Sequence, residues 1–133
     1  MIPDFDERGY LPAGVHLASL DEIDARFGRQ SEVRQVQMES LRWLVELARR
    51  AGVRRLIING SFVTKRLEPN DVDCVLLTGQ GLSHDKDVDR EIRGGLPFLQ
   101  IALIGQEDFD FMVDTVFATD RKRIPKGVVE VVL

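Results

Sequence analysis

The most constraining feature of the sequence is a Gly-Ser pair followed by an acidic strand. The chain reads Gly60-Ser61, nine further residues, and then the run DVDCVLL that begins at Asp71. Alternate residues of an extended strand point to the same face, so Asp71 and Asp73 should project together while Val72 faces a core. Two carboxylates on one face repel each other unless a cation lies between them. Carboxylate oxygens suit magnesium, so this stretch predicts a divalent metal site.

Size and composition favour one domain that spans residues 1–133. A chain of 133 residues with 44% hydrophobic and 30% charged residues is ordinary for a soluble globular protein. The net charge of −4 gives no general argument for nucleic-acid binding, although a local basic patch leaves it open. The lone cysteine, Cys74, lies in a predicted buried strand, and the N-terminus lacks the pattern of a signal peptide. With no apolar run near the ~20 residues of a membrane span, we expect a cytoplasmic protein without membrane contact.

Capping and turn residues divide the chain into alternating helices and strands. Residues 1–18 predict an irregular N-terminal arm that packs on the body, because glycine and proline recur in it. Helices are predicted over 21–27, 32–51, 62–67 and 84–93, and strands over 56–58, 71–77, 109–118 and 128–133. Residues 98–104 fit a buried helix or a strand equally well. Arg34 and Gln37 are expected on the polar face of the long helix. The order predicts an α+β fold of α/β-like character, a mixed sheet packed by helices.

The Gly-Ser…Asp-x-Asp spacing resembles the signature of the nucleotidyltransferase superfamily, to which DNA polymerase beta belongs. This resemblance covers residues 40–118. The arm FDERGYLPAGVH, the block NGSFVTKRLEPNDVDCVLL and the late VDTVF also resemble a bacterial group of small nucleotidyltransferase-like proteins. The resemblance implies a minimal nucleotidyltransferase fold and transfer of a nucleoside monophosphate from a nucleoside triphosphate such as ATP. One departure is Asn59, where the superfamily prefers an apolar residue.

The resemblance also implies three catalytic carboxylates that hold two Mg²⁺ ions. Two metals about 3.5–4 Å apart can stabilise the attacking and leaving oxygens of an in-line displacement. Asp71 and Asp73 supply two ligands, and in the superfamily the third comes from a neighbouring strand with the pattern apolar-Asp-apolar. Asp114 is preferred because it lies in the middle of a predicted strand, and Asp110 is the alternative. The two would lie about 13 Å apart along a strand, so only one can reach the metals.

Phosphate contacts are predicted around the Gly-Ser turn. Gly60 allows the backbone to approach a phosphate closely, and Ser61 offers a hydroxyl and an N–H to the β,γ-phosphates. Lys65 and Arg66 either reach the triphosphate or form a solvated helix face. A second basic group fits a charged surface turn better than a phosphate site, and its members are Arg121, Lys122, Arg123 and Lys126. Neither histidine, His16 or His84, has metal-ligand spacing, so both are expected at the surface or in loops.

The acceptor is not identified by the sequence, and RNA, a protein or a small molecule all stay open. Larger superfamily members carry an additional domain for the acceptor, and 133 residues leave no room for one. An acceptor site completed by a homo-oligomer or by a small partner protein is therefore the expectation, and analogy adds a toxin–antitoxin component. The alternative function is a catalytically silent module that binds nucleotide or a partner. A weaker third hypothesis is RNA binding by the arginines at positions 49, 50, 54 and 55.

Overall fold

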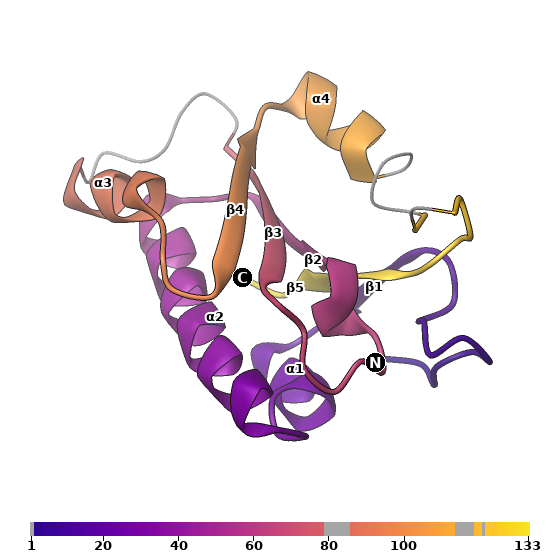
Figure 1. The fold of residues 1–133 in the computed structure, drawn as a ribbon. Helices are drawn as coiled ribbons and strands as arrows, with labels where there is room; N and C mark the ends of the chain where they lie inside the picture. Colours follow the sequence, from indigo (N-terminus) through magenta and orange to yellow (C-terminus); the bar gives the residue numbers. More distant parts are fainter. Residues whose placement is uncertain (1, 79–85, 114–118, 121) are drawn as a thin grey trace.

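A five-stranded mixed sheet forms the centre of the molecule in the computed structural model (Figure 1). The structure describes residues 2–78, 86–113, 119–120 and 122–133. The strands, in the order β1-β5-β2-β3-β4, are β1 (Val15–Ala18), β2 (Arg55–Asn59), β3 (Val72–Leu77), β4 (Leu99–Ile104) and β5 (Val128–Val131). The helices are α1 (Leu20–Phe27), α2 (Glu32–Ala51), the 3₁₀ helix η1 (Gly60–Val63), α3 (Lys86–Gly94) and α4 (Gln106–Phe111). β2 is antiparallel to β3 and β5, whereas β1–β5 and β3–β4 are parallel pairs. The predicted α+β fold with a mixed sheet is confirmed.

Side-chain caps set the boundaries of the first two helices as predicted. The Ser19 hydroxyl accepts from the Glu22 N–H and the Glu22 carboxylate accepts from the Ser19 N–H, both at 3.2 Å, which is a capping box. Ser31 caps α2 by accepting from the Arg34 N–H at 3.1 Å. The helix ends at Gly52, whose φ of 72° is the left-handed conformation that glycine adopts most easily.

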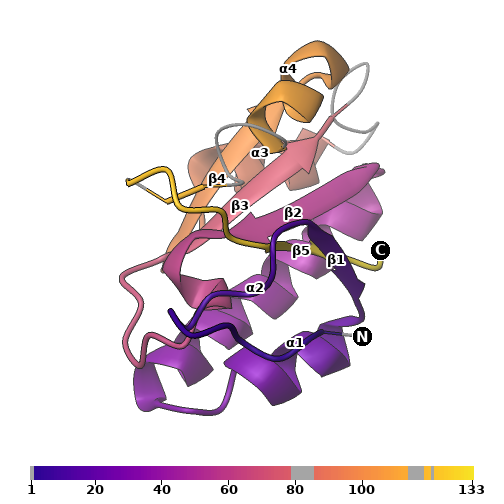
Figure 2. The same cartoon turned by 90° about the vertical axis from the view of Figure 1, so that its right-hand side faces the viewer.

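One face of the sheet is covered by helices and holds the main core. Figure 2 shows α1 and α2 on one side of the sheet and α4 beyond the other. Leu41, Leu44 and Ala48 of α2 are fully buried in one apolar cluster with Ile58 and Cys74 of the sheet. The alternation of β3 therefore places its first valine and its cysteine in the core, as predicted.

The opposite face carries a second, smaller apolar cluster. Phe109 and Val113, in and just after α4, form a second apolar cluster with Ile57, Val75 and Val128. Of these strand residues, Val75 lies in the carboxyl-terminal half of β3, and Ile57 is its partner on β2. Asp71 and Asp73, at the amino end of β3, belong to neither apolar cluster, and Gly60 of η1 contacts Asp73. We call this side of the sheet the open face.

Several sequence predictions need correction. Residues 15–18 belong to the parallel strand β1 and not to an irregular arm, and the turn after β2 is a 3₁₀ helix at residues 60–63 and not at 62–67. The ambiguous segment 98–104 contains the strand β4. The predicted strand 109–118 is wrong at residues 109–113, because 109–111 belong to α4 and 112–113 continue as a π-helical turn, and residues 114–118 lie outside the described part. Gly105 begins that helix and Glu107 and Asp108 favour its first turn, which outweighs the β propensity of the aromatic residues.

Within the described ranges, every helix falls short of the length or the apolar character that a membrane crossing requires.

Candidate active site

Strand register places Asp73 in a row of polar side chains on the open face. Asn59 of β2 is the cross-strand partner of Asp73, and Gln100 of β4 is its partner on the other side. Partners in adjacent strands point to the same face, so an amide flanks the carboxylate on each side. Asp71 lies two residues earlier, and its Oδ2 accepts from Gln100 Nε2 at 3.3 Å. The predicted same-face placement of the two aspartates is confirmed.

A cavity of about 640 Å³ opens over this row and gathers most of the predicted site. Five predicted residues line it, namely Gly60, Ser61, Arg66, Asp71 and Asp73. Gln100 and Lys126, which were not predicted as site residues, line it as well. We call this space the carboxylate cavity.

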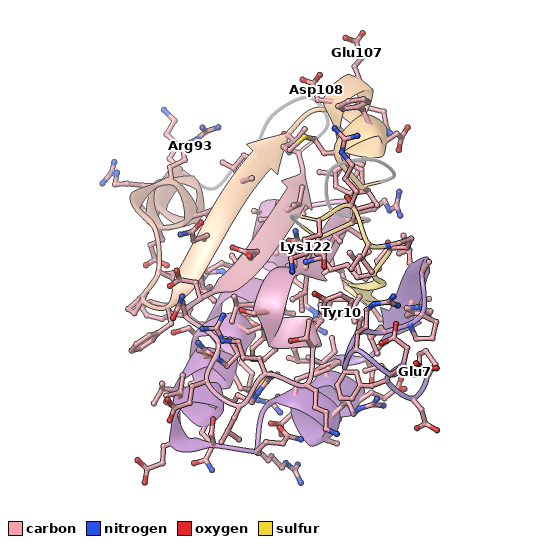
Figure 3. All side chains as sticks on the ribbon, turned by 45° about the vertical axis from the view of Figure 1, so that its right-hand side comes forward. Glu7, Tyr10, Arg93, Glu107, Asp108 and Lys122 are labelled. Carbon is pink, nitrogen blue, oxygen red and sulfur yellow. The ribbon has the colours of Figure 1, made fainter. Side chains whose placement is uncertain are left out.

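Two other predicted residues lie elsewhere, and one lies outside the described residues. Lys65 lines a neighbouring cavity and not this one. Asp110 lies on α4, where its Oδ2 accepts from Gln106 Nε2 at 3.1 Å, and it does not line the carboxylate cavity. Figure 3 shows Glu107 and Asp108 of the same helix at the far end of the molecule from Tyr10. Asp114, the preferred third carboxylate, lies outside the described residues, as does His84.

Gly60 is fixed by its contact with Asp73. Its φ is 77°, and a Cβ atom at this position would run into Oδ2 of Asp73 and lie 3.1 Å from Cγ. The sequence predicted that Gly60 admits a phosphate, but the close neighbour that it accommodates is the aspartate carboxylate. The turn after β2 therefore packs against the acidic strand and sets the position of its second carboxylate.

The charges in the carboxylate cavity are only partly balanced. Burial raises the pKa of Asp73, the charge of Asp71 raises it further, and Lys126 opposes both. Burial lowers the pKa of Lys126, and Asp73 and Asp120 oppose that effect. The ammonium group therefore compensates the carboxylates incompletely, and an additional cation would be stabilised beside them.

The donor set fits a hard divalent cation. Asn59 is 5% exposed, and its Oδ1 atom is buried without a hydrogen-bond partner. An unpaired buried oxygen is unfavourable; Asn59 is the cross-strand partner of Asp73, although it does not line the carboxylate cavity itself. Oxygen atoms of two aspartates and two amides are ligands that Mg²⁺ accepts. No three acidic, histidine or cysteine side chains of the described ranges converge on one metal position, and Asp114 is not among those ranges.

A buried arginine holds the segment that carries Ser61 and Arg66. Arg34 of α2 is 2% exposed. Its guanidinium donates to the carbonyl oxygens of Phe27, Phe62, Thr64 and Arg66, at 2.8 to 3.0 Å for the first three. Burial lowers its pKa to about 10, so it stays charged near neutral pH. Hydrogen bonds to backbone carbonyl oxygens, together with the Phe62 ring, whose centroid lies 5.2 Å from Cζ, hold this buried cation and fix the connection between β2 and β3.

The prediction that Arg34 and Gln37 lie on an exposed face is therefore wrong. Gln37 is fully buried and donates from Nε2 to the Pro69 carbonyl oxygen. A signal was present in the sequence. Both residues extend the stripe of core positions that continues with Leu41 and Leu44 at helical spacing. The stripe does not reveal that irregular backbone packed against α2 needs hydrogen-bond donors.

Lys126 is also corrected, from a surface turn to a half-buried lining residue. The Tyr10 hydroxyl donates to Asp120 Oδ2 at 2.8 Å, which ties the N-terminal arm to the loop before β5. Asp120 Oδ1 also accepts from the N–H groups of Lys122 and Ile124, at 2.8 and 2.9 Å. In Figure 3, Tyr10 and Lys122 lie on the same side of the molecule as η1. This short loop is thus ordered by hydrogen bonds and presents Lys126 to the cavity.

Other basic and titratable residues have structural partners. Arg55 forms a bidentate ion pair with Glu130 across β2 and β5, at 2.7 and 3.0 Å. His16 lies in β1 with Nε2 2.7 Å from the Pro12 carbonyl oxygen. These contacts account for the positions of Arg55 and His16 without any bound ligand.

Comparison with known proteins identifies the family but not its activity. No curated protein and no solved structure gave a significant match. One family model matches residues 3–132, which is nearly the whole chain. The chain belongs to that family, a family of unknown function (DUF6932).

Proposed function

We propose that the protein is a magnesium-dependent nucleotidyltransferase: an acceptor oxygen displaces pyrophosphate from the α-phosphate of a nucleoside triphosphate, which moves the nucleoside monophosphate to the acceptor. One observation carries the proposal: Asp71, Asp73, Ser61 and Arg66 line a single cavity on the open face. Residues from both halves of the spacing that resembles the superfamily signature therefore lie together, and this supports the proposal. A cytoplasmic setting fits the buried, lone thiol of Cys74.

The chain's own groups have distinct tasks in this reaction. Mg²⁺, when bound, would neutralise the triphosphate and stabilise the charge that develops at the α-phosphate. Asp71 and Asp73 would hold it, and strand pairing and the contact with Gly60 keep Asp73 in place. Arg66 and Lys126 would neutralise phosphate oxygens. The acceptor would enter from solvent, and an oligomer or a small partner protein would complete its site.

Replacement of one carboxylate tests the proposal. Asp73→Asn keeps the shape of the side chain and removes its charge, so we expect loss of magnesium-dependent nucleotide binding and of transfer with the fold retained. Asp110→Asn, on the exposed face of α4, is the matched control and should change neither. The assay supplies each α-labelled triphosphate with Mg²⁺ and cell extract and identifies the labelled acceptor. Unchanged labelling by the Asp73 variant would remove the assignment.

A second candidate, a silent module that binds nucleotide without transfer, is favoured by Gln100. The superfamily takes its third carboxylate from a strand next to the Asp-x-Asp strand, in the pattern apolar-Asp-apolar. β4 is such a strand, and Leu99-Gln100-Ile101 places an amide opposite Asp73. An amide oxygen can bind a cation, but the amide is neutral, so it does not balance the positive charge of a second metal ion.

The two candidates differ in their products. The silent module predicts magnesium-dependent binding of triphosphate, measured by calorimetry, and no labelled acceptor in any extract. Asp114→Asn separates them further, since it abolishes transfer only if that residue supplies the third carboxylate. Gln100→Asp should tighten binding of Mn²⁺ in both cases, because it adds a charge beside Asp73.

A further inference from the structure

A second cavity lies beside the first and is built by the N-terminal arm. It has a volume of about 360 Å³ and lies between residues 8–10 and the segment after β2. Ser61, Arg66 and Lys126 line both cavities. We call it the arm cavity, and nothing in the function proposed above uses its own residues.

The lining of the arm cavity is strongly cationic. Arg8, Lys65, Arg66 and Lys126 contribute four positive side chains, and no aspartate or glutamate of the described ranges lines it. The Ser61 hydroxyl adds a neutral donor, whereas the Tyr10 hydroxyl donates to Asp120 and the Thr64 hydroxyl donates to the Ser61 carbonyl oxygen. Four like charges around one small space repel one another, and a bound polyanion would relieve that repulsion.

Backbone hydrogen bonds hold these charges together despite their repulsion. The Lys65 N–H donates to the Gly9 carbonyl oxygen at 2.8 Å, and the Arg8 N–H donates to Asp6 Oδ1 at 2.8 Å. Gly9 has a φ of 79°, and a Cβ there would lie 2.9 Å from Lys65 Cβ, so only glycine permits this contact. Tyr10 pairs with Thr64 in an isolated bridge. The arm is therefore fixed against the loop, and the positions of the cationic residues that line the arm cavity are set by the fold.

We propose that the arm cavity is a binding site for a phosphate group adjacent to the carboxylate cavity. The shared wall allows one ligand to place a metal-bound phosphate beside Asp73 and a further phosphate beside Arg8 and Lys65. The phosphate comes either from the end of the nucleoside triphosphate or from the acceptor. This inference rests on the proposed function for what occupies the carboxylate cavity, whereas binding of the anion itself does not require the metal.

Inorganic pyrophosphate without metal is the first probe. Calorimetry at low salt should give binding to the wild-type protein that weakens about tenfold in Arg8→Gln and in Lys65→Gln, because each change removes one charge-assisted hydrogen bond. Lys122→Gln, exposed on the neighbouring loop, is the control and should keep wild-type affinity within about twofold. Arg8 and Lys65 are exposed, so these variants should keep the wild-type melting temperature. Equal pyrophosphate binding by all four proteins overturns the inference.

A competition experiment identifies the source of the phosphate. If the triphosphate supplies it, a saturating non-hydrolysable ATP analogue with Mg²⁺ excludes pyrophosphate, and Arg8→Gln weakens the analogue but not AMP. If the acceptor supplies it, pyrophosphate and the analogue bind together, and Arg8→Gln leaves the analogue unaffected. Asp73→Asn should lose metal-dependent analogue binding and keep metal-free pyrophosphate binding. Analogue binding that survives in Asp73→Asn would count against the proposed function alone. Equal pyrophosphate binding by the four proteins would count against this inference alone, so the two failures can be told apart.

Discussion

Alternate side chains of β3 enter two different environments. Val72, Cys74 and Leu76 point to the helix-covered face, where each is at most 1% exposed. Asp73 points to the open face and lies half-buried between two amides. The covered face consists of apolar contacts that favour folding, whereas the open face gathers polar groups that are incompletely paired.

The comparison indicates which face the fold depends on and which face a ligand would complete. On the covered face, burial raises the pKa of the Cys74 thiol, and its Sγ donates to the Val72 carbonyl oxygen at 3.7 Å. Such a thiol is an inert core group. On the open face, Asn59 has an unpaired Oδ1 and Asp73 has a raised pKa, and both residues line a cavity. Titratable groups with perturbed pKa values in clefts are typical of functional sites. Substitutions on the two faces should therefore affect different properties.

The largest expected effect on stability is in the covered core. Leu44→Ala should lower the free energy of unfolding by about 2–5 kcal/mol, because it removes a fully buried side chain and leaves a cavity. Val36→Ala, on the same helix and 39% exposed, should change it by less than about 1 kcal/mol. Urea unfolding followed by circular dichroism measures both. Equal losses in the two variants would mean that α2 does not cover the sheet as described.

The next effect tests the link between the two faces. Arg34→Met should lower the free energy of unfolding by about 2–3 kcal/mol, because the loop carbonyl groups that it binds lose a buried, charged donor. Arg42→Met is the control on the same helix. Arg42 lies partly exposed, 2.9 Å from Asp24, and such a pair contributes about 1 kcal/mol or less.

Function should respond to Arg34 as well, since the arginine holds the backbone on which Ser61 and Arg66 lie. Nucleotide binding by Arg34→Met, measured below its unfolding transition, should be weaker than that of Arg42→Met. Wild-type affinity in the Arg34 variant would show that the loop keeps its position without the buried arginine.

The sequence was informative where local rules decide the structure. The caps at Ser19, Ser31 and Gly52 define two helices, and period-2 alternation places Asp71 and Asp73 on one face. These features depend on neighbours in sequence. They recovered the α+β architecture and most of the lining of the carboxylate cavity.

The parts that sequence reasoning missed depend on distant contacts. Lys126 lies near Asp73 because β5 pairs with β2, and Gln100 is opposite Asp73 because β4 joins β3 in parallel. Neither register can be read from local patterns. Arg34 is buried because an irregular loop presents carbonyl groups to it, which helical periodicity does not encode. The helix α4 formed because its first-turn charges outweighed β propensity at Phe109.

A smaller effect on stability, with a larger effect on the site, is expected at Gly60. Gly60→Ala should cost about 1–2 kcal/mol, because its φ is left-handed and the added Cβ would displace Asp73. Gly105→Ala is the control, since φ there is −77° and a Cβ would meet open space. Binding of Mn²⁺, measured by calorimetry, should be lost in the first variant and unchanged in the second. Intact Mn²⁺ binding in Gly60→Ala would mean that the metal site does not depend on the contact between Gly60 and Asp73.

The smallest expected change in stability is that of Asp73→Asn on the open face. It should stabilise the protein, whereas the substitutions above destabilise it, so its sign distinguishes the two faces. Folding raises the pKa of Asp73 through burial and the charge of Asp71, so the folded state binds its proton more tightly than the unfolded chain does. The contribution of Asp73 to the free energy of unfolding is therefore favourable at low pH and declines as pH rises from the unfolded pKa of about 3.9 through the raised folded value.

Asp73→Asn should be more stable than wild type at neutral pH, by about 0.5 kcal/mol or less, and this advantage should disappear below about pH 4. Thermal melts across this range measure it, and Mg²⁺ should reverse the order at neutral pH because it stabilises only the protein that binds it. A variant that is less stable than wild type without metal would mean that the fold itself uses this carboxylate, and the division between the two faces would fail.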